Sequence, residues 1–567
     1  MSAYFFTRAH MTLISKKLLP KVAVVGGGIS GLTAAYALRD RAHVTLFEAN
    51  DYIGGHTNTV DIEVEGQQVA VDTGFLVYNE RTYPNLIRLF EELNVETVES
   101  DMSFSVCLPE LNIEWAGTNL NTVFAQRRNL LRPRFIRMLL DILRFNKEAT
   151  AMVADAGRAD LFKSKAKMHL GDYLVQEKYS AEFRDWYLIP MAAAIWSCPS
   201  EQMLAFPVAT FIQFCHNHGL LQVNDRPKWF TVKNGARNYV QKILPFIDVV
   251  HKSTPVQEVD TTGPKPIVKT SLGAQEFDQV ILACHSDEAL AMLKGNEAQK
   301  EQLRHIKYQP NVAYLHTDAK LMPKTRSTWS SWNYLSDVLN PQPSVSVTYW
   351  SNLLQPLPVK TPIFVTLNPI IQPDSNKVFR EIHYSHPVFD VPAVQAQEAL
   401  AKLQGLNNVY LAGAWMKYGF HEDGLKAGLG VARHLPERPA AHVHAQPLRQ
   451  LGVVAQFGVG IQRQVVGVEV DVVRQQQAQA LLHPARHPPV LAAPEQAVVH
   501  QDGVGAFGNR SIDQGTAGGH PAHKLAHLRA AFDLQPVGTI VLEQRGLEQL
   551  VQRMGEGLAG NGRWRRT

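Results

Sequence analysis

A glycine-rich turn near the N-terminus constrains the fold more than any other feature. Residues 22–25 form an apolar run that is typical of a strand buried on both faces of a parallel sheet. Gly26, Gly28 and Gly31 follow with the spacing GxGxxG, and Ile29–Leu38 reads as a helix rich in alanine and leucine. The first glycine permits a tight turn, the second lets a pyrophosphate approach the backbone, and the third brings the helix against the strand. The stretch therefore predicts a dinucleotide-binding unit.

An acidic residue closes this unit. A second apolar strand, His43–Phe47, ends at Glu48, about 20 residues beyond the glycines, where a carboxylate can accept hydrogen bonds from a ribose diol. The N-terminal amides of the helix and the positive end of its dipole point at the bound phosphate. We therefore interpret the following residues as cofactor-binding: Gly26, Gly28, Ser30, Gly31 and Glu48.

Composition limits what such a chain does. Its 567 residues, 45% of them hydrophobic, can fill several cores, so we expect more than one domain. The formal net charge of +4 is too small for the positive field that nucleic-acid binding needs. Four widely spaced cysteines suit reduced thiols, and the first twenty residues hold Arg8 and His10 between short apolar runs, which excludes a signal peptide or a spanning helix there. We expect a cytoplasmic protein that binds no nucleic acid.

The residues after Glu48 indicate which dinucleotide is bound. They read ANDYIGGHTNT, with a Gly54-Gly55 pair that resembles the FAD fingerprint of the flavin-containing amine oxidase superfamily, which also holds phytoene desaturases and protoporphyrinogen oxidases. In that superfamily the pair is usually followed by arginine, whereas this chain has His56. Asp72-Thr73-Gly74 resembles a further superfamily motif that leads the chain past the cofactor. The resemblance implies FAD as the cofactor.

Later segments carry the same resemblance. The stretch that begins at Asn408, NVYLAGAWMKYGFHEDGLKAGLG, looks like the C-terminal FAD motif, with Gly413 in its turn and Gly424 at the start of a helix. The N-terminus of that helix can stabilise negative charge on reduced flavin. FDQVILAC, from Phe277, resembles another strand of the nucleotide domain, and TVKNGARNYV together with the strand around Val256 resembles the support of the adenine end.

Segments that resemble parts of the FAD-binding domain are separated by long stretches of other sequence. This order implies an interleaved α/β architecture. We expect a Rossmann-like FAD-binding domain built from residues 21–82, 226–290 and 402–435, and an α+β substrate domain built from residues 83–225 and 291–401. Residues 1–20 form an N-terminal extension. From residue 436 to 567 there is one lysine and no tyrosine, and nothing resembles the flavoproteins. We interpret this tail as a frame-shifted or otherwise non-native, disordered extension, with a small accessory domain as the alternative.

The resemblance implies that the chemistry comes from the flavin, which accepts hydride from a substrate C–H next to nitrogen or to an unsaturated carbon. Oxygen or an unknown acceptor reoxidises it. In amine oxidases a lysine holds a water near the flavin, and Asn311 and Val312 stand at the matching position here, which weakens the amine interpretation. Trp415, Tyr418 and His421 are candidate pocket residues, with surface or core packing as the alternative.

A closer resemblance suggests the substrate. GFLVYNERTYPNL, PMAAAIWS and AGAWMKYGFHEDGL resemble a bacterial group of amine oxidase-like oxidoreductases that tend to be encoded near cyclopropane-fatty-acid-synthase-like methyltransferases. A small hydrophobic, lipid-like substrate is therefore favoured. A flavin-dependent isomerase and a non-catalytic flavin-binding scaffold remain as alternatives.

Four other segments receive structural interpretations. The region of Cys215, His216 and His218 and the HYSH stretch at residues 383–386 are taken as satisfied loops, so no metal is expected. The run at residues 188–199 is taken as a buried helix, with Trp196 facing the flavin as the alternative. In residues 129–147 one face of an amphipathic helix is expected to face the core, with peripheral membrane contact, at the inner face of the membrane, as the alternative. That face holds Phe135, Ile136, Leu139, Leu140 and Leu143, with Arg134, Arg137, Arg144 and Lys147 around its rim.

Overall fold

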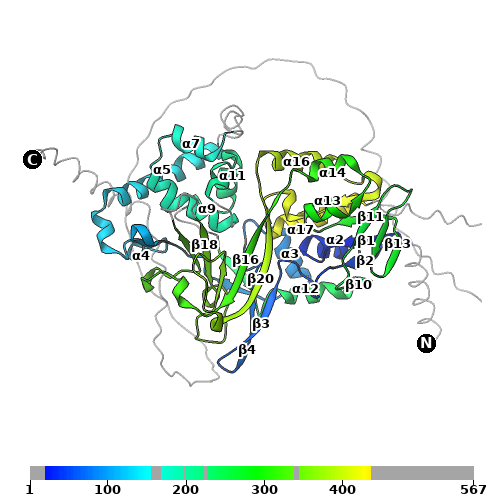
Figure 1. Ribbon diagram of the computed structural model, residues 1–567, viewed down its shortest axis with the longest axis horizontal. Coiled ribbons are helices and arrows are strands. Elements are labelled where there is room, and N and C mark those ends of the chain that lie inside the picture. Colours follow the sequence, from blue (N-terminus) through cyan, green and yellow to red (C-terminus); the bar gives the residue numbers. More distant parts are fainter. Residues whose placement is uncertain (1–18, 155–167, 197–199, 223–226, 338–343, 436–567) are drawn as a thin grey trace, which may run out of the picture. The chain divides into compact units, whose positions relative to one another are not determined.

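The computed structural model describes residues 19–154, 168–196, 200–222, 227–337 and 344–435 (Figure 1). The expectations for the N-terminal extension up to residue 18, for residues 197–199 and for the tail from residue 436 lie outside this part of the chain.

A five-stranded parallel sheet forms around the N-terminal strand. Its order is β10-β2-β1-β14-β21, and every neighbouring pair is parallel. The strands are β1 (Lys21–Val25), β2 (His43–Phe47), β10 (Val249–His251), β14 (Gln279–Leu282) and β21 (Val409–Leu411). Numbered along the chain, this is the Rossmann-like order 3-2-1-4-5, with its switch point between β1 and β14. The Rossmann-like unit expected from the glycine turn is confirmed.

Helices cover both faces of this sheet, which explains the continuous apolar run of β1. Val22 and Val24 point into one core and Ala23 and Val25 into another. The first core lies under α2 (Ile29–Leu38), α3 (Pro84–Glu92), α12 (Arg237–Ile243) and α17 (His421–His434). The second lies under α13 (Ser286–Met292), α14 (Glu297–Leu303) and α16 (Val391–Lys402).

A seven-stranded mixed sheet forms the second domain. Its order is β20-β16-β19-β18-β17-β7-β8, and only the β17–β7 pair is parallel. The strands are β7 (Phe104–Leu108), β8 (Ile113–Ala116), β16 (Tyr308–His316), β17 (Trp332–Ser336), β18 (Val345–Trp350), β19 (Phe364–Leu367) and β20 (Val378–Pro387). The chain enters and leaves this sheet between visits to the parallel sheet, so the interleaved two-domain architecture is confirmed.

A helical layer packs on the second domain. It contains α5 (Pro133–Ala154), α7 (Leu170–Gln176), α8 (Ala181–Phe183), a π-helix (Arg184–Leu188), α9 (Ile189–Trp196), α10 (Ser200–Leu204) and α11 (Val208–Asn217). Phe135, Ile136 and Leu139 of α5 are buried, so its apolar face is core-facing as expected, whereas Leu140 is 44% exposed. Trp196 is buried against Phe206 and Phe214, so the buried-helix expectation holds for α9.

Smaller sheets and helices complete the described chain. They are the hairpin β3 (Thr59–Val64) and β4 (Gln67–Asp72), the sheet of β5 (Tyr78–Asn79), β9 (Trp229–Val232) and β6 (Thr97–Ser100), the sheet of β13 (Gly273–Glu276), β12 (Ile267–Thr270), β11 (Glu258–Asp260) and β15 (Leu293–Lys294), and the short helices α4 (Leu120–Val123) and α15 (Ser351–Leu354).

Two expected loops are regular structure instead. Cys215 and His216 lie in α11, and His218 caps that helix, because the run that precedes them has a buried apolar face. The HYSH stretch lies in β20, because its backbone pairs with β16 in antiparallel register. No group of His, Cys, Asp or Glu in the described residues is arranged to hold a metal ion.

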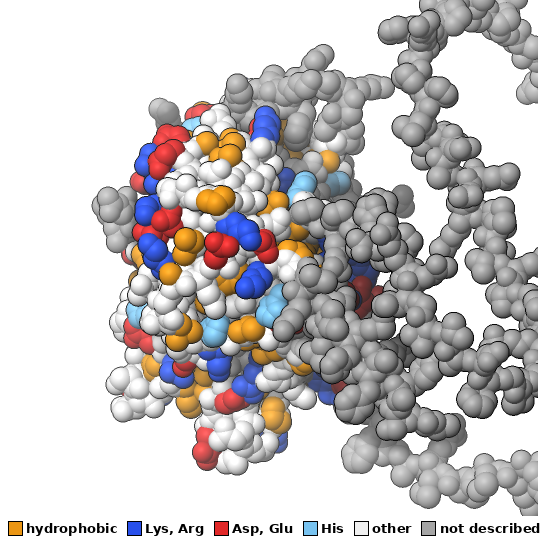
Figure 2. Space-filling model, turned by 90° about the vertical axis from the view of Figure 1, so that its right-hand side faces the viewer, with side chains coloured by type: hydrophobic (Ala, Val, Ile, Leu, Met, Phe, Trp, Pro, Cys, Tyr) orange, Lys and Arg blue, Asp and Glu red, His pale blue; other side chains and the backbone are white. Residues whose placement is uncertain are grey.

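The molecular surface over the parallel sheet carries both signs of charge. Figure 2 shows acidic and basic side chains interspersed on this face, without a large area of one sign. Ion pairs in the described chain include Lys265 with Asp278 and Lys294 with Asp260. Among the described residues no helix is both long and apolar enough to cross a membrane.

Helices α2 and α17 approach closely because α17 carries glycine at the contact. A Cβ atom at Gly428 would collide with the carbonyl oxygen of Ser30, and one at Gly424 would lie 2.8 Å from Ile29 Cγ2. Nothing lies within 4 Å of the corresponding position at Gly430, on the same helix. The contact therefore depends on Gly424 and Gly428.

This difference gives a matched test of the helix contact. Gly428→Ala should destabilise the protein by about 1–3 kcal/mol, because the backbone oxygen of Ser30 cannot move without shifting α2. Gly430→Ala should be neutral or stabilise by up to about 1 kcal/mol through helix propensity alone. Urea unfolding midpoints of the two variants measure the effect. Equal midpoints for the two variants would contradict the close contact.

Candidate functional site

The glycine turn lies at the carboxyl end of β1. Gly26 has φ of +105°, and a Cβ there would lie 2.8 Å from the carbonyl oxygen of Ala283, so the turn needs glycine for its own conformation. Gly28 differs: its φ is −73°, and nothing lies within 4 Å of its Cβ position. The fold therefore tolerates a side chain at Gly28, and the space beside it is open to a ligand.

The N-terminus of α2 opens onto the same space. Gly28 is its N-cap, and no side chain satisfies the first amides of the helix. Those unsatisfied N–H groups and the helix dipole favour an anion. A glycine without a Cβ beside an uncapped helix is a cradle for a phosphate group.

Glu48 stands where β2 ends. One oxygen of its buried carboxylate accepts a hydrogen bond from Gly27 N at 2.7 Å, and the other accepts from Asn50 N at 2.9 Å and Asn50 Nδ2 at 3.0 Å. These bonds fix the carboxylate at the edge of the sheet next to the turn. The cradle together with this acceptor fits the pyrophosphate and ribose of a dinucleotide.

The Gly54-Gly55 pair packs against the turn. Gly54 forms an isolated bridge with Gly28, and a Cβ at Gly55 would lie 3.1 Å from Gly28 Cα. The following His56 has a buried Nε2 atom that finds no hydrogen-bond partner among the described residues. A buried polar atom without a partner is costly unless a ligand satisfies it.

Rings from both domains surround His56. The ring centroid of Tyr384 lies 4.9 Å away, that of His386 5.4 Å and that of His285 6.0 Å. Burial, and then the neighbouring imidazoles, lower the pKa of His56 well below its usual value. Burial likewise lowers the pKa of His386 to about 4. The junction therefore presents uncharged imidazoles at neutral pH.

His421 begins α17 on the other side of this junction. Its ring stacks on Phe75 at 3.8 Å, and its Nε2 lies 2.9 Å from the Tyr239 hydroxyl, which contacts Thr57 Oγ1 at 2.5 Å. Burial lowers the pKa of His421 to about 3. The structure thus brings His421 to the glycine-pair segment through one intervening tyrosine.

The other late candidates serve mainly as packing. Trp415 is 2% exposed and donates from Nε1 to the Cys284 carbonyl oxygen at 3.1 Å, so its indole closes the core between β14 and β21. It also covers Gly413, where a Cβ would overlap its ring. Tyr418 lies beside Phe214 of the helical layer. These contacts favour core packing for Trp415 and Tyr418.

The Asp72-Thr73-Gly74 segment ties the two domains together. Asp72 accepts hydrogen bonds from Thr59 Oγ1, from Ala236 N at the start of α12, and from Gln355 Nε2. Burial raises its pKa to about 6 despite those bonds. Thr73 Oγ1 lies 2.9 Å from the Tyr384 hydroxyl. The Asp72 side chain is therefore directed at α12, and Thr73 at β20.

The remaining cofactor candidates lie at the edges of the site. Gly74 packs on the backbone of His56, where a Cβ would collide with the His56 oxygen. Gly424 serves the contact of α17 with α2 near Ser30. Val256 is half-buried between β10 and β11. The structure brings the turn, Glu48, the glycine pair and His56 together, and places Gly424 and Asp72 in supporting contacts.

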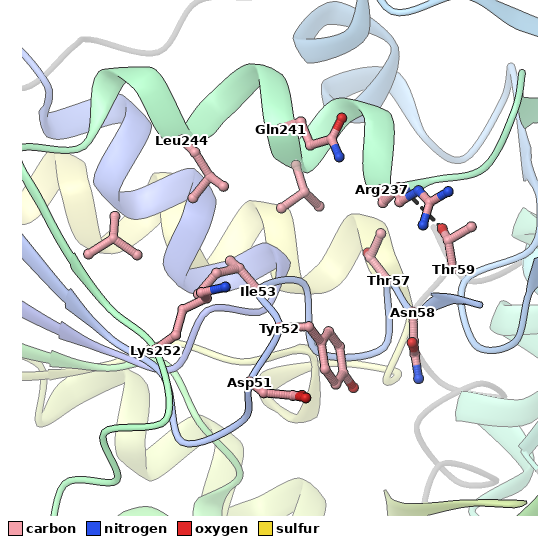
Figure 3. A pocket seen from close by; sticks show the side chains of 12 residues that line it. Asp51, Tyr52, Ile53, Thr57, Asn58, Thr59, Arg237, Gln241, Leu244 and Lys252 are labelled. Atoms are coloured by element: carbon pink, nitrogen blue, oxygen red, sulfur yellow. Dashed lines mark hydrogen bonds between the residues drawn. The ribbon is translucent and has the colours of Figure 1, made fainter. Parts of the chain in front are cut away.

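A separate pocket lies beside the site. It has a volume of about 520 Å³ and opens between α12 and the segment 51–59, and Figure 3 shows Tyr52, Asp51 and Lys252 on one side of it and Arg237 and Gln241 on the other. Gly28 and Glu48 do not line it. The pocket therefore adjoins the cradle without containing it.

The fold and this cradle define a dinucleotide-binding protein with two interleaved domains. The family model for flavin-containing amine oxidoreductases matches residues 29–348, more than half of the chain. The chain therefore belongs to the flavin-containing amine oxidoreductase family. Its cofactor is FAD.

Curated relatives match over short stretches. The carotenoid phi-ring synthase of Streptomyces griseus is 30% identical over 165 residues, which are 27% of this chain and 31% of that protein. The flavin-containing amine oxidase B of Sus scrofa is 46% identical over 78 residues, 13% of this chain and 14% of that protein. The chain thus spans about a third, or less, of the length of these relatives.

Solved structures match over most of the described chain. A CLA-producing fatty acid isomerase from P. acnes has a TM-score of 0.53 at 14% identity, covering 74% of this chain and 99% of that one. Cyclohexylamine oxidase from Brevibacterium oxydans IH-35A has a TM-score of 0.53 at 15% identity, covering 73% and 98%. At these identities the likeness shows the fold.

Three of the rings that surround His56 escaped prediction from the sequence. His386, His285 and Tyr384 were not among the expected site residues, because nothing local marks a strand residue as facing another domain. One signal was available: HYSH alternates, and a strand would place Tyr384 and His386 on one face. Pairing of β20 with β16 would then have suggested the junction.

Replacing Gly28 separates cofactor binding from folding. Gly28→Ala should change the stability of the apoprotein by no more than about 0.5 kcal/mol, because the Cβ meets no atom. The same Cβ occupies the space of the cradle, so FAD binding should weaken at least tenfold. Titration of apoprotein with FAD, followed by flavin fluorescence, measures this. Gly26→Ala is the contrasting variant and should lower stability itself. Unchanged FAD affinity in Gly28→Ala would refute the cradle.

Proposed function

We propose that this oxidoreductase removes hydride from a C–H bond next to an unsaturated carbon, or next to nitrogen, in a small hydrophobic, lipid-like substrate. Bound FAD supplies the hydride acceptor. Gly26, Gly28 and the amides of α2 would hold its pyrophosphate, and Glu48 would accept from its ribose. The amides at the start of α17 would offset negative charge on the reduced cofactor. Oxygen is the proposed acceptor of the electrons.

The character of the junction between the two domains supports the lipid-like substrate. Its imidazoles are uncharged, and the buried carboxylates nearby, such as Glu48 and Asp72, are already engaged by backbone and side-chain donors. Asn311, fully buried in β16, stands at the position we align with the amine oxidase lysine. An ammonium substrate would therefore find no free carboxylate among the described residues of this cluster. This observation carries the proposal.

The domain boundaries are part of the same proposal. We place the FAD-binding domain at residues 21–82, 226–290 and 402–435, which include all five parallel strands. The substrate domain, residues 83–225 and 291–401, includes the seven-stranded sheet and the helical layer. The histidine junction lies where these two sets of residues meet.

Anaerobic reduction tests the substrate class. The purified protein should show flavin absorbance bands that bleach on anaerobic mixing with unsaturated or methyl-branched fatty acyl lipids, and not with alkylamines. Bleaching by amines alone would contradict the lipid-like substrate. Lipid conversion without net flavin reduction would replace oxidation with isomerisation, and the absence of flavin bands would overturn the role of the cradle.

We also propose that the outer face of the α5 region docks on an anionic membrane. Leu131 is 88% exposed and Leu140 is 44% exposed, next to the exposed cations Arg127, Arg128 and Arg137. In the part of the chain that the structure describes, Arg127 and Arg128 contact only Asn121 and the Asn112 carbonyl oxygen, which leave their charge unneutralised. Exposed apolar side chains with basic neighbours favour anionic lipid.

Vesicle binding tests this face. The protein should sediment with phosphatidylglycerol vesicles more than with phosphatidylcholine vesicles, and less as salt rises, because salt screens the arginine charges. Leu131→Glu should weaken sedimentation at least threefold. Leu272→Glu, at a leucine 66% exposed in the β12–β13 turn, is the matched control and should have no effect. Equal loss in both variants, or no loss in either, would contradict the docking face.

A further inference from the structure

A row of amide hydrogen bonds leads to His386. The backbone N–H of Val312 donates to Asn368 Oδ1 at 2.9 Å, and Asn368 Nδ2 donates to Asn311 Oδ1 at 2.6 Å. Asn311 Nδ2 in turn lies 3.1 Å from His386 Nδ1. Asn311 is 1% exposed, so water does not compete for these bonds.

The direction of every bond in this row is fixed from both ends. A backbone N–H only donates, so Asn368 must turn its oxygen toward Val312 and its nitrogen toward Asn311. Asn311 Nδ2 also donates to the carbonyl oxygen of Gln309 at 3.3 Å, and a carbonyl oxygen only accepts. Both anchors require the same orientation of the Asn311 amide. The nitrogen that faces His386 is therefore a donor.

The row consequently decides the tautomer of His386. Its Nδ1 must accept from Asn311, and an uncharged imidazole carries one proton, which is then on Nε2. No described residue accepts a hydrogen bond from that Nε2–H. The antiparallel pairing of Gln309 with His386 puts Asn311, Tyr384 and His386 on one face of the sheet, the face that meets His56.

We propose that Asn368 and Asn311 are positioning residues that hold His386 as a hydrogen-bond donor, and that this donor selects an acyl substrate through its carbonyl or carboxylate oxygen. The inference deepens the proposed function and rests on it for the substrate. A donor with no lone pair on Nε2 gives an alkylammonium ion nothing to bind. An acyl oxygen, which only accepts, completes the bond.

Nitrogen NMR of ¹⁵N-histidine protein reads the tautomer directly. His386 of the wild-type protein, assigned with His386→Gln, should show the protonated Nε2 and unprotonated Nδ1 shifts. Asn311→Asp should reverse them, because a carboxylate accepts and cannot donate. Asn376→Asp, at an exposed asparagine before β20, is the matched control and should leave the shifts unchanged. A proton on Nδ1 in the wild-type protein overturns the inference without any variant, and unreversed shifts in folded Asn311→Asp overturn it as well.

Three probes of equal chain length test the selection. Octadecanoate, its methyl ester and octadecylamine are added to the holoprotein, and the His386 Nε2 shift and the flavin absorbance are followed. The acid, the ester or both should shift the His386 Nε2 resonance, and the amine should not. The probe with the larger shift shows whether a carboxylate or an ester carbonyl oxygen is preferred. In Asn311→Asp the preference for acyl over amine should fall at least tenfold.

The outcomes separate this inference from the proposed function. A protein that binds no FAD but has the Nε2–H tautomer defeats the proposed function and leaves the positioning role intact. A protein that binds FAD, has that tautomer and yet binds the amine as well as the acyl probes defeats the selection alone.

Discussion

The close contact between α2 and α17 is the constraint on which the site depends. It joins α2 and α17 of the Rossmann-like unit at Gly428, where a Cβ would meet the backbone of Ser30, and at Gly424, where a Cβ would meet the side chains of Ile29 and Ser30. Because α2 begins at the phosphate cradle and α17 begins at His421, their spacing sets the distance between the cradle and the junction of the two domains. The small residues at this contact therefore set the geometry of the site.

Burying the histidine cluster at the junction of the two domains lowers the stability of the fold, and we attribute its presence to function. Four imidazoles, those of His56, His285, His386 and His421, lie among buried tyrosines, and burial keeps at least three of them uncharged. Burying polar rings without partners lowers stability, and His56 Nε2 has no partner among the residues that the structure describes. Hydrophobic residues would pack there with less loss. A protein keeps such a cluster where a bound molecule completes its hydrogen bonds.

A feature of the fold or the site could be predicted from the sequence where the residues that determine it lie close together in the chain. The strand, turn and helix around Gly26 lie within about one supersecondary unit, so spacing alone predicted them. Glu48 follows directly after β2, so its place in the site could be predicted from the sequence as well. The cluster around His56 depends on the register of β16 with β20, which no pattern in either strand specifies. Trp415 shows that closeness in the sequence can also mislead. It lies two residues from Gly413, a candidate cofactor glycine, yet its indole packs in the core.

Asn311 stands at the position that we align with the amine oxidase lysine, and it places an amide, not a cation, at the junction. A lysine would bring a positive charge next to the uncharged imidazoles, whereas Asn311 brings a dipole whose direction is fixed by Val312 and Gln309. In the proposed function, the amides at the start of α17 offset part of the negative charge that develops on the reduced cofactor. Such a junction disfavours an ammonium substrate, since the described carboxylates near it are engaged by donors and its imidazoles are uncharged. On our proposal, the oxygen of an acyl substrate is the acceptor that completes the hydrogen bonds of this junction.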